Sequence, residues 1–346
     1  MQALAIKYRP KNWGDVTEQN CIKSILENQL RNDELQHCYL FVGSAGTGKT
    51  TCARIFANQI NKGQGNPIEL DAASNNSVED MRDLIAQAKT RSLDSEYKVF
   101  IVDECHMITV QGWNAVLKLI EEPPAKSIFI FCTTDPQKIP KTILSRVQRY
   151  DFQRISQQGI VERLNKICVE EHVVMNYAPV TSTHWKAIDY IAKIADGGMR
   201  DAITMLDKCL AYSSELTIEN VVNILGVADY DTMFNLTDAL SCANDVEILN
   251  VIEELHTTGK DLKQFIKDYT HFILDIEKYM AGCDDKYISI PSIPEYMNKL
   301  NEYCNPKAFT FRDLLRALIE LNSNIKYSSS PKVDIECALL LVEVCK

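Results

Sequence analysis

The sequence predicts an α/β protein that is built on a parallel sheet and continues into regions that are entirely helical. Short apolar runs alternate with amphipathic segments up to about residue 150, a pattern typical of a parallel sheet with helices on both faces. A glycine-rich loop follows the first of these runs directly, at the place where parallel sheets bind ligands. Beyond Asp151 strand-like runs disappear, and helical periodicity continues along the chain.

The composition excludes several classes of protein. The chain has 346 residues, of which 46% are hydrophobic and 24% charged, enough for two or three domains with cores of their own. No apolar run approaches the length of a membrane span, and residues 1–9 lack the apolar core of a signal peptide. We therefore expect a cytoplasmic protein that makes no contact with a membrane.

Cysteine usage and net charge narrow the classes further. The 12 cysteines occur singly and never as C-x-x-C pairs, which favours buried free thiols in a reducing compartment over disulfides or a zinc site. The net charge of −10 argues against a surface that is basic overall and binds nucleic acid everywhere. A local basic track remains compatible with this charge.

The stretch from Gly43 to Thr50 carries the strongest chemical signal. It fits G-x-x-x-x-G-K-[ST] and lies between an apolar strand at 38–42 and a helical segment at 51–60. Glycines let backbone N–H groups wrap an anion, and a helix N-terminus adds partial positive charge. A chance glycine turn is the alternative. We assign phosphate binding to the loop and the residue after it: Gly43, Ser44, Ala45, Gly46, Thr47, Gly48, Lys49, Thr50 and Thr51.

Within this loop two side chains have distinct roles. Lys49 is expected to reach the β- and γ-phosphates of a nucleotide, and the Thr50 hydroxyl to ligate Mg²⁺.

On its N-terminal side the loop is preceded by an amphipathic helix at 20–32. A second strand is predicted at 68–72, and Ser77 is predicted to cap the following helix with Asp80 in an approximate capping box.

A third apolar strand, at 97–102, ends in two carboxylates. Downstream of a phosphate-binding loop, Asp103 would hold Mg²⁺ and Glu104 would polarise the attacking water. The alternative is an acidic cap on the next helix. His106 has no neighbours at metal-ligand spacing, and we expect it to be structural.

The fourth predicted strand, at 127–134, ends in hydroxyls. It follows a helix at 111–121 that stops at Pro123. Ligands of such sheets bind at the C-terminal ends of strands, so Thr134 could orient the lytic water. A hydroxyl that only closes the backbone at the end of the strand is the alternative.

The order of these motifs resembles one family, the AAA+ ATPase subunits of sliding-clamp loaders, and within it the bacterial DNA polymerase III gamma/tau subunits. The resemblance covers nearly the whole chain. Single motifs are common among nucleotide hydrolases, but the ordered set is specific. Beside the glycine-rich loop, these stretches carry it: Lys7-Tyr8-Arg9-Pro10, Asp103-Glu104-Cys105-His106-Met107, Glu121-Glu122-Pro123-Pro124, Thr133-Thr134-Asp135-Pro136, Ser145-Arg146 and Gly197-Gly198-Met199-Arg200-Asp201-Ala202.

The resemblance implies a role for several further residues. Thr134 corresponds to sensor 1, and Arg200 to sensor 2, which contacts the γ-phosphate of its own ATP. Arg146 corresponds to the arginine that reaches into a neighbouring subunit's site, although the residues alone would allow a plain surface arginine. The family's N-terminal box, which lies against the adenine of ATP, corresponds here to Lys7-Tyr8-Arg9-Pro10, and the residues expected to contact the nucleotide in this region are Tyr8, Arg9, Pro10 and Val16.

The resemblance also implies an architecture and an activity. The expected domains are an AAA+ P-loop ATPase domain at 1–156, a small helical lid at 157–214 and an all-α collar for oligomerisation at 215–346. The expected activity is ATP hydrolysis with Mg²⁺ by a motor subunit that opens a sliding clamp and loads it on primer–template DNA. The expected partners are the clamp, other loader subunits in a ring or spiral with five members, and DNA, in a bacterial or virus-infected bacterial cell.

Two departures from the family pattern stand out. Val147 replaces the cysteine of the family's Ser-Arg-Cys motif, although the arginine remains. The loop at 61–67 is too short for the family's four-cysteine zinc module and contains no cysteine, so we predict no zinc. We also expect no long extension of the kind by which tau-type subunits bind helicase and polymerase, as in a compact viral or minimal form.

Two other functions remain as alternatives. A non-hydrolysing stator subunit tends to lose the P-loop lysine or the acidic pair, whereas Lys49, Asp103 and Glu104 are all present here. Another AAA+ machine that remodels DNA, such as a branch-migration helicase, is favoured by a winged-helix end, and none is evident in the sequence.

DNA binding is expected at the helix that opens at Ser77. The family encloses the duplex and contacts phosphates with helix N-termini and a few basic side chains. Arg82 lies a turn into this helix and is the candidate; a solvated face residue is the alternative.

Overall fold

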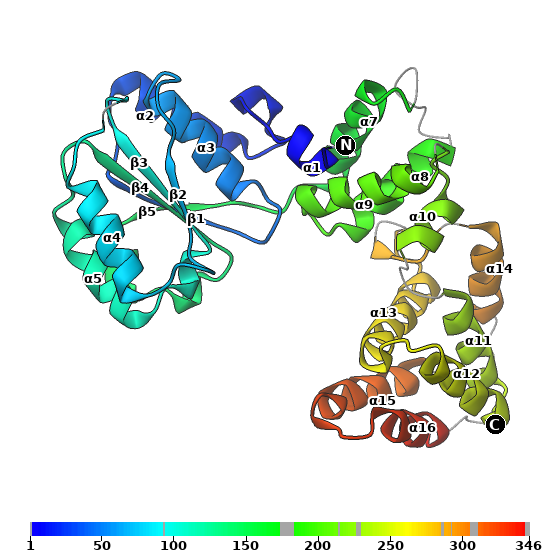
Figure 1. Cartoon of the computed structure of the whole chain (residues 1–346). Helices are drawn as coiled ribbons and strands as arrows, with labels where there is room; N and C mark the ends of the chain where they lie inside the picture. The colour runs from blue at the N-terminus through cyan, green and yellow to red at the C-terminus, as the bar shows by residue number, and fades with distance from the viewer. Residues whose placement is uncertain are drawn as a thin grey trace. The chain divides into compact units, whose positions relative to one another are not determined.

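The computed structural model describes residues 2–92, 94–173, 183–213, 215–225, 230–284, 287–291, 293–304 and 311–342. The chain divides into two compact units, Met1–Glu215 and Leu216–Lys346 (Figure 1). The separation of a lid from the ATPase domain at residue 156 stays a prediction, because both lie within the first unit. Ser214, the predicted end of the lid, lies outside the described residues.

A five-stranded parallel sheet forms the centre of the first unit, in the order β2-β3-β4-β1-β5. This confirms the predicted fold class, and four of the strands lie where the apolar runs placed them. The strands are β1 (Cys38–Val42), β2 (Ile68–Asp71), β3 (Lys98–Asp103), β4 (Ser127–Thr133) and β5 (Gln148–Asp151). Because all five are parallel, the ends of β1, β3 and β4 meet at one edge of the sheet.

The fifth strand was missing from the sequence prediction. β5 pairs only with β1, at the edge of the sheet, and Tyr150 is its one buried residue. A four-residue edge strand with a single inward side chain shows no apolar run. The sequence therefore shows no strand signal at 148–151, because β5 lies at the edge of the sheet and is paired on one side only.

Helices cover both faces of the sheet, and alternate strand residues point to opposite faces. Tyr39 and Phe41 pack into the cluster beneath α2 (Asn20–Asn32) and α3 (Lys49–Ile60). Leu40 packs on the other face, beneath α4 (Val78–Ala88) and α5 (Val110–Glu121). Figure 1 shows the two helix pairs on opposite sides of the strands. With both faces buried, every residue of β1 is apolar and buried, which explains its continuous apolar run.

Local sequence signals set the start of α4. The Ser77 side chain accepts a hydrogen bond from the Asp80 N–H, and the Asp80 carboxylate accepts one from the Ser77 N–H. This confirms the predicted capping box, which satisfies N–H groups that a helix end leaves without partners. A short helix, α6 (Lys141–Leu144), follows β4.

The rest of the first unit is helical. α7 (Gln157–Glu170), α8 (Thr183–Ile194) and α9 (Met199–Tyr212) pack on one another, and the short α1 (Leu4–Lys7) packs on α9. The Leu4 N–H donates to the Asp207 carboxylate at 3.0 Å. The N-terminal segment is therefore held by the helices that follow the sheet.

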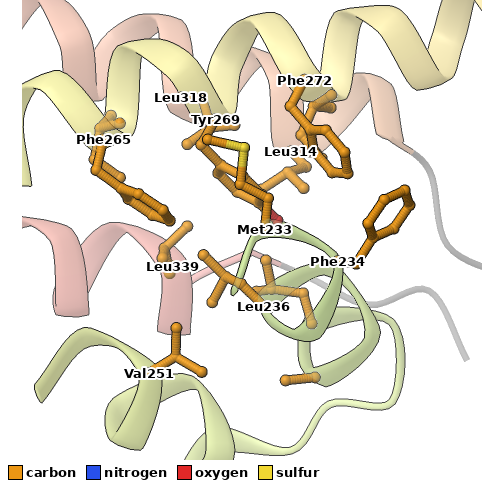
Figure 2. Packing of buried hydrophobic residues seen from close by; sticks show 14 of the residues in the cluster. Met233, Phe234, Leu236, Val251, Phe265, Tyr269, Phe272, Leu314, Leu318 and Leu339 are labelled. Carbon is orange, nitrogen blue, oxygen red and sulfur yellow. The ribbon is translucent and has the colours of Figure 1, made fainter. Parts of the chain in front are cut away.

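The second unit has a helical core of its own. Phe234 packs edge-to-face on Phe272 with ring centroids 4.9 Å apart (Figure 2). The buried Thr237 and Tyr269 hydroxyls lie 2.9 Å apart. The described helices are α10 (Ile218–Leu225), α11 (Tyr230–Ser241), α12 (Asp245–Thr257), α13 (Leu262–Met280), α14 (Pro294–Tyr303), α15 (Phe311–Asn324) and α16 (Pro331–Leu340). Within the described residues of both units, no helix combines the length and the apolarity needed to cross a membrane.

Candidate nucleotide-binding site

A pocket in the first unit opens over the glycine-rich loop. Segments from four parts of the chain line it: the N-terminal region, the loop, the end of β3 and the helices after the sheet. The lining residues are Ala5, Tyr8, Arg9, Pro10, Asp15, Val16, Thr17, Ala45, Gly46, Thr47, Gly48, Lys49, Thr50, Thr51, Asp103, Glu104, Ile155, Arg163, Met199, Arg200, Asp201 and Ile203. Most of the residues predicted to bind nucleotide therefore meet here.

Other predicted site residues lie outside this lining. Gly43 and Ser44 belong to the loop, and their backbone carbonyls accept hydrogen bonds from Lys49 Nζ. Thr134 reaches the pocket only through Glu104. Arg82 and Arg146 are on the surface, away from the lining residues.

The loop backbone depends on glycine at two positions. Gly46 and Gly48 have φ of 72° and 100°, in the left-handed region that side chains disfavour. A Cβ on Gly46 would also lie 3.0 Å from the Cα of Gly198, just before α9. The Met199 N–H donates to the Gly46 carbonyl at 3.1 Å. The loop is thus joined directly to the segment that carries Arg200.

Lys49 is a buried cation placed for an anion. Its side chain is in the first turn of α3, the residue is 5% exposed, and Nζ donates to the Gly43 and Ser44 carbonyls at 2.8 Å each. Burial lowers the pKa of Lys49, and the nearby Glu104 and Asp103 carboxylates oppose that shift. Among the described residues no carboxylate lies within ion-pair distance of Nζ. A phosphate would supply the missing opposite charge.

Thr50 and Asp103 form a pair of oxygen ligands. The Thr50 hydroxyl donates to Asp103 Oδ2 at 2.7 Å, and Asp103 Oδ1 accepts the Glu104 N–H at 3.0 Å. Hydroxyl and carboxylate oxygens suit Mg²⁺, which is commonly held by one or two protein groups together with phosphate oxygens and water. These two residues fit the ion that the phosphate-binding loop implies. Glu104, the N-cap residue of the next helical turn, makes no capping hydrogen bond with its side chain, as the acidic-cap alternative would require.

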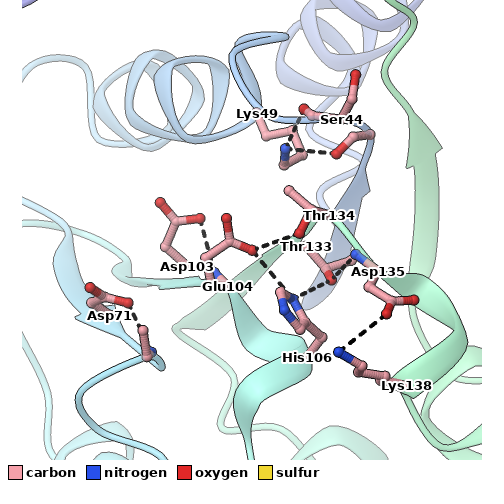
Figure 3. A network of polar contacts seen from close by, with 12 residues as sticks. Ser44, Lys49, Asp71, Asp103, Glu104, His106, Thr133, Thr134, Asp135 and Lys138 are labelled. Carbon is pink, nitrogen blue, oxygen red and sulfur yellow. Dashed lines mark hydrogen bonds and ion pairs between the residues drawn. The ribbon is translucent and has the colours of Figure 1, made fainter. Parts of the chain in front are cut away.

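Glu104 belongs to a polar network at the ends of β3 and β4 (Figure 3). Its backbone is left-handed, with φ 45° and ψ 42°. The Thr134 hydroxyl donates to Glu104 Oε2 at 3.1 Å, and His106 Nδ1 lies 3.3 Å from the same oxygen. The alternative for Thr134 was a hydroxyl that closes the backbone at the end of the strand. Thr133 has this role, because its hydroxyl accepts the Asp135 N–H at 3.0 Å.

The N-terminal box lies against the helices after the sheet. The Tyr8 hydroxyl donates to Glu171 Oε1 at 2.6 Å, and Lys7 Nζ lies 2.5 Å from the same oxygen. Burial and the hydrogen bond to Glu171 raise the pKa of Tyr8 to about 12. Arg163 of α7 donates to the Tyr8 carbonyl at 2.9 Å and lines the pocket. Arg163 was not predicted from the sequence, because a single arginine on an amphipathic helix carries no motif.

Arg200 and Arg146 occupy different settings. Arg200 is an exposed side chain in the first turn of α9 and lines the pocket. Arg146 lies after α6, where its guanidinium contacts a Glu121 carboxylate oxygen at 2.8 Å and donates to the Thr142 carbonyl at 2.7 Å. Arg146 is therefore bound to its own surface and does not reach the pocket of its own chain.

No cluster of three or more His, Cys, Asp or Glu side chains that could hold a metal ion occurs among the described residues. Thr50 and Asp103 are a different kind of site, because phosphates and water complete the coordination of Mg²⁺. The expectation of no zinc stays a prediction.

Two family models match parts of the chain. A family model described as "DNA polymerase III, delta subunit" matches residues 66–156. A second, described as "DNA polymerase III subunits gamma and tau domain III", matches residues 216–342.

Curated relatives agree with these models. The DNA polymerase III subunit tau of Bacillus subtilis is 34% identical over 368 residues, covering 100% of this chain and 63% of the relative. The gamma/tau subunit of Mycobacterium tuberculosis strain H37Rv is 34% identical over 318 residues, covering 85% of this chain and 54% of the relative. For the Escherichia coli tau subunit the values are 33% over 280 residues, 75% and 42%. The chain thus spans 63% or less of the length of these relatives.

Solved structures agree on the fold. The RuvB Holliday junction branch migration motor of Thermotoga maritima superposes with a TM-score of 0.52 at 18% identity, covering 67% of this chain and 79% of that chain. A second RuvB structure from the same organism covers 84% and 91% at 16% identity. At this identity the likeness supports the AAA+ fold only.

Proposed function

The chain belongs to the family of DNA polymerase III gamma and tau subunits, and from this membership we propose that it is an ATP-driven motor subunit of a clamp loader. In this role it binds ATP with Mg²⁺, opens a DNA sliding clamp together with partner subunits, and loads the clamp on primer–template DNA. The names of the relatives and the AAA+ fold support the proposal at the level of the family.

One observation carries the proposal of hydrolysis. Lys49, Thr50, Asp103 and Glu104 converge on one pocket, and Arg200 lines the same pocket from α9. A subunit that only binds its neighbours has no use for a buried lysine without a carboxylate partner, because burial of a charge is costly. The complete set therefore favours a motor over a stator.

Each residue would act on a different part of the reaction. When Mg²⁺ is bound it neutralises charge on the phosphate oxygens, and Thr50 and Asp103 would hold it. Lys49 would bind the β- and γ-phosphates, and Arg200 would contact the γ-phosphate. Glu104 would accept a proton from the attacking water, and Thr134 would orient that water together with Glu104.

The nucleotide base would lie at the N-terminal box. Tyr8, Arg9, Pro10 and Val16 line the pocket on the side of the helices after the sheet. Because Tyr8 is bound to Glu171 of the segment after α7, adenine at this position would contact a surface formed jointly by the box and those helices.

The partners follow from the proposed role. Arg146 would enter the site of a neighbouring subunit and stabilise charge on the transferring phosphoryl group. The second unit, matched by the gamma and tau domain III model, would hold the subunits in a ring or spiral. Arg82 and the N-terminus of α4 would contact phosphates of the enclosed duplex without reading its sequence.

The Glu104→Gln variant tests the proposal. We expect it to bind ATP with unchanged affinity but to hydrolyse it at least about 100-fold more slowly, because an amide cannot accept the proton of the attacking water. Binding is measured with a fluorescent ATP analogue, and hydrolysis by phosphate release in the presence of the clamp, partner subunits and primer–template DNA. Glu34→Gln, an exposed glutamate after α2, is the matched control.

Two results would contradict the proposal. Normal hydrolysis by Glu104→Gln would show that another group activates the water. Hydrolysis by the wild-type chain that ignores both clamp and primer–template DNA would separate the ATPase activity from clamp loading.

A further inference from the structure

The Glu104 carboxylate is held on one oxygen only. Oε2 accepts the Thr134 hydroxyl at 3.1 Å and lies 3.3 Å from His106 Nδ1. Among the described residues Oε1 has no hydrogen-bond partner. The two neighbours come from different places, Thr134 from the end of β4 and His106 from the helical turn after β3 (Figure 3).

The imidazole of His106 is itself fixed by a buried group. Its Nδ1 lies 3.1 Å from the Thr133 hydroxyl, and Thr133 is completely buried and anchored by the Asp135 N–H. The His106 side chain is 12% exposed, whereas that of Glu104 is 37% exposed. The buried end of β4 thus supports the imidazole, and the imidazole supports the more exposed carboxylate.

The contacts identify the protonated ring nitrogen. An ionised carboxylate can only accept hydrogen bonds, so the nitrogen that faces it must carry the proton. We therefore assign the proton to His106 Nδ1, which hydrogen-bonds the Thr133 hydroxyl and lies within ion-pair distance of Glu104 Oε2.

The glutamate needs such support. A glutamate side chain has three rotatable bonds and loses rotamer freedom when it is held in one geometry. The left-handed backbone of Glu104 directs the side chain toward β4, but the backbone alone does not select a rotamer. Donors on a single oxygen restrain the carboxylate while leaving the second oxygen available.

We propose that His106 is a positioning residue that, together with Thr134, holds Glu104 Oε2 so that Oε1 stays free to accept the proton of the attacking water. The inference rests on the proposed function, because it assigns the orientation of the base in that reaction. His106 does not itself line the pocket, and the lining residue that it contacts is Glu104, so it acts through Glu104.

Two substitutions distinguish positioning from packing. In His106→Asn the amide NH₂ can occupy the place of Nδ1, whereas in His106→Gln it extends to the place of Nε2. We expect Asn to keep kcat within about 3-fold of wild type. His106→Gln and His106→Ala should lower kcat between about 10- and 100-fold with ATP affinity unchanged, because misplacement of a catalytic group by about 1 Å has an effect of this size.

The measurements are steady-state ATP hydrolysis, ATP binding with a fluorescent analogue and the thermal unfolding midpoint. His256→Asn, an exposed histidine of α12, is the matched control. Thr134→Val removes the other donor, and its effect should combine with that of His106→Ala less than additively, because both restrain one carboxylate.

Three results would overturn the inference. Equal losses in Asn, Gln and Ala together with a lower unfolding midpoint would make His106 a packing residue. A higher kcat in His106→Ala would mean that the contact holds Glu104 away from the water. Unchanged kcat in all variants would mean that it has no role. Glu104→Gln in the same series separates the proposals: if that variant hydrolyses normally, the proposed function of Glu104 has failed, whatever His106 does.

Discussion

The nucleotide pocket buries its cationic side chain, whereas the cationic side chain on the surface around Arg146 is exposed. Lys49 is 5% exposed and donates to two backbone carbonyls of its own loop. The Arg146 side chain is 38% exposed and contacts Glu121, which is itself 45% exposed. Lys49 is enclosed by its own chain, whereas Arg146 is held at the surface by the Glu121 carboxylate, which water can replace.

The difference in exposure distinguishes a residue that acts in the site of its own subunit (in cis) from one that acts in the site of a neighbouring subunit (in trans). A residue that serves its own pocket can be placed by buried groups, since those groups stay where the fold puts them. A residue that serves a neighbour must stay exposed until that neighbour binds, and an exposed ion pair is weak enough to be exchanged. A substitution of Lys49 should therefore impair ATP binding by the isolated chain, whereas a substitution of Arg146 should impair only hydrolysis in the assembled complex.

The largest effect is expected for Lys49→Ala. The isolated chain should lose measurable ATP binding, because the substitution removes the cation that meets the β- and γ-phosphates. Binding is measured with a fluorescent ATP analogue at several Mg²⁺ concentrations. Lys89→Ala, an exposed lysine at the end of α4, is the control. Retained micromolar binding by Lys49→Ala would place the phosphates elsewhere.

Arg146→Ala should leave ATP affinity of the isolated chain unchanged and lower hydrolysis in the assembled complex by about 10³ or more, as expected for an arginine finger. Mixing this variant with Lys49→Ala subunits should restore part of the activity, at interfaces that pair an intact loop with an intact arginine. Arg149→Ala, which removes a similar exposed ion pair with Asp151, is the control. Weaker ATP binding by the isolated Arg146→Ala chain would mean that the arginine acts in cis, and the comparison would break.

A smaller effect is expected for Arg82→Ala. The Arg82 side chain is 69% exposed and lies 3.7 Å from Glu79, so solvent already competes for it. If it neutralises one phosphate, the substitution should weaken stimulation of hydrolysis by primer–template DNA and reduce the salt slope by about 1.

The test titrates salt on two primer–templates of unrelated sequence. Arg316→Ala is the control, because Arg316 forms a similar exposed pair with Asp313 in the second unit. Stimulation that follows DNA sequence and ignores salt would contradict phosphate contact, and an unchanged slope would leave Arg82 as a solvated face residue.

The smallest effect is expected for Glu121→Gln. Arg146 must leave this carboxylate to reach a neighbour's phosphate, so removal of the charge should raise hydrolysis in the complex. An exposed ion pair is worth at most about 1 kcal/mol, which limits the increase to about 5-fold. Phosphate release at low and high salt measures it, and the increase should shrink as salt rises. A decrease would mean that Glu121 presents the arginine to the neighbour and does not hold it back.

The sequence predicted the elements whose signals are local. A strand buried on both faces has an apolar run, and a capped helix shows its capping residues, so β1, β3, β4 and α4 were placed correctly. β5 was missed because an edge strand with Tyr150 as its one inward residue has neither signal. Arg163 was missed for a similar reason, since its contact with the Tyr8 carbonyl joins residues far apart in the chain.

Contiguous residues were enough to predict the chemistry of the proposed phosphate site. The glycines, Lys49 and Thr50 are contiguous, and their geometry follows from local backbone conformation and the start of one helix. The tertiary structure supplies the groups of β4 that act on Glu104. His106 is only two residues beyond Glu104 in the chain, whereas Thr134, which donates to Glu104, and Thr133, whose hydroxyl contacts His106, come from the end of β4. They reach this position because β4 lies between β3 and β1 in the sheet. No single segment encodes that order of strands, because it results from the packing of all the strands and helices together.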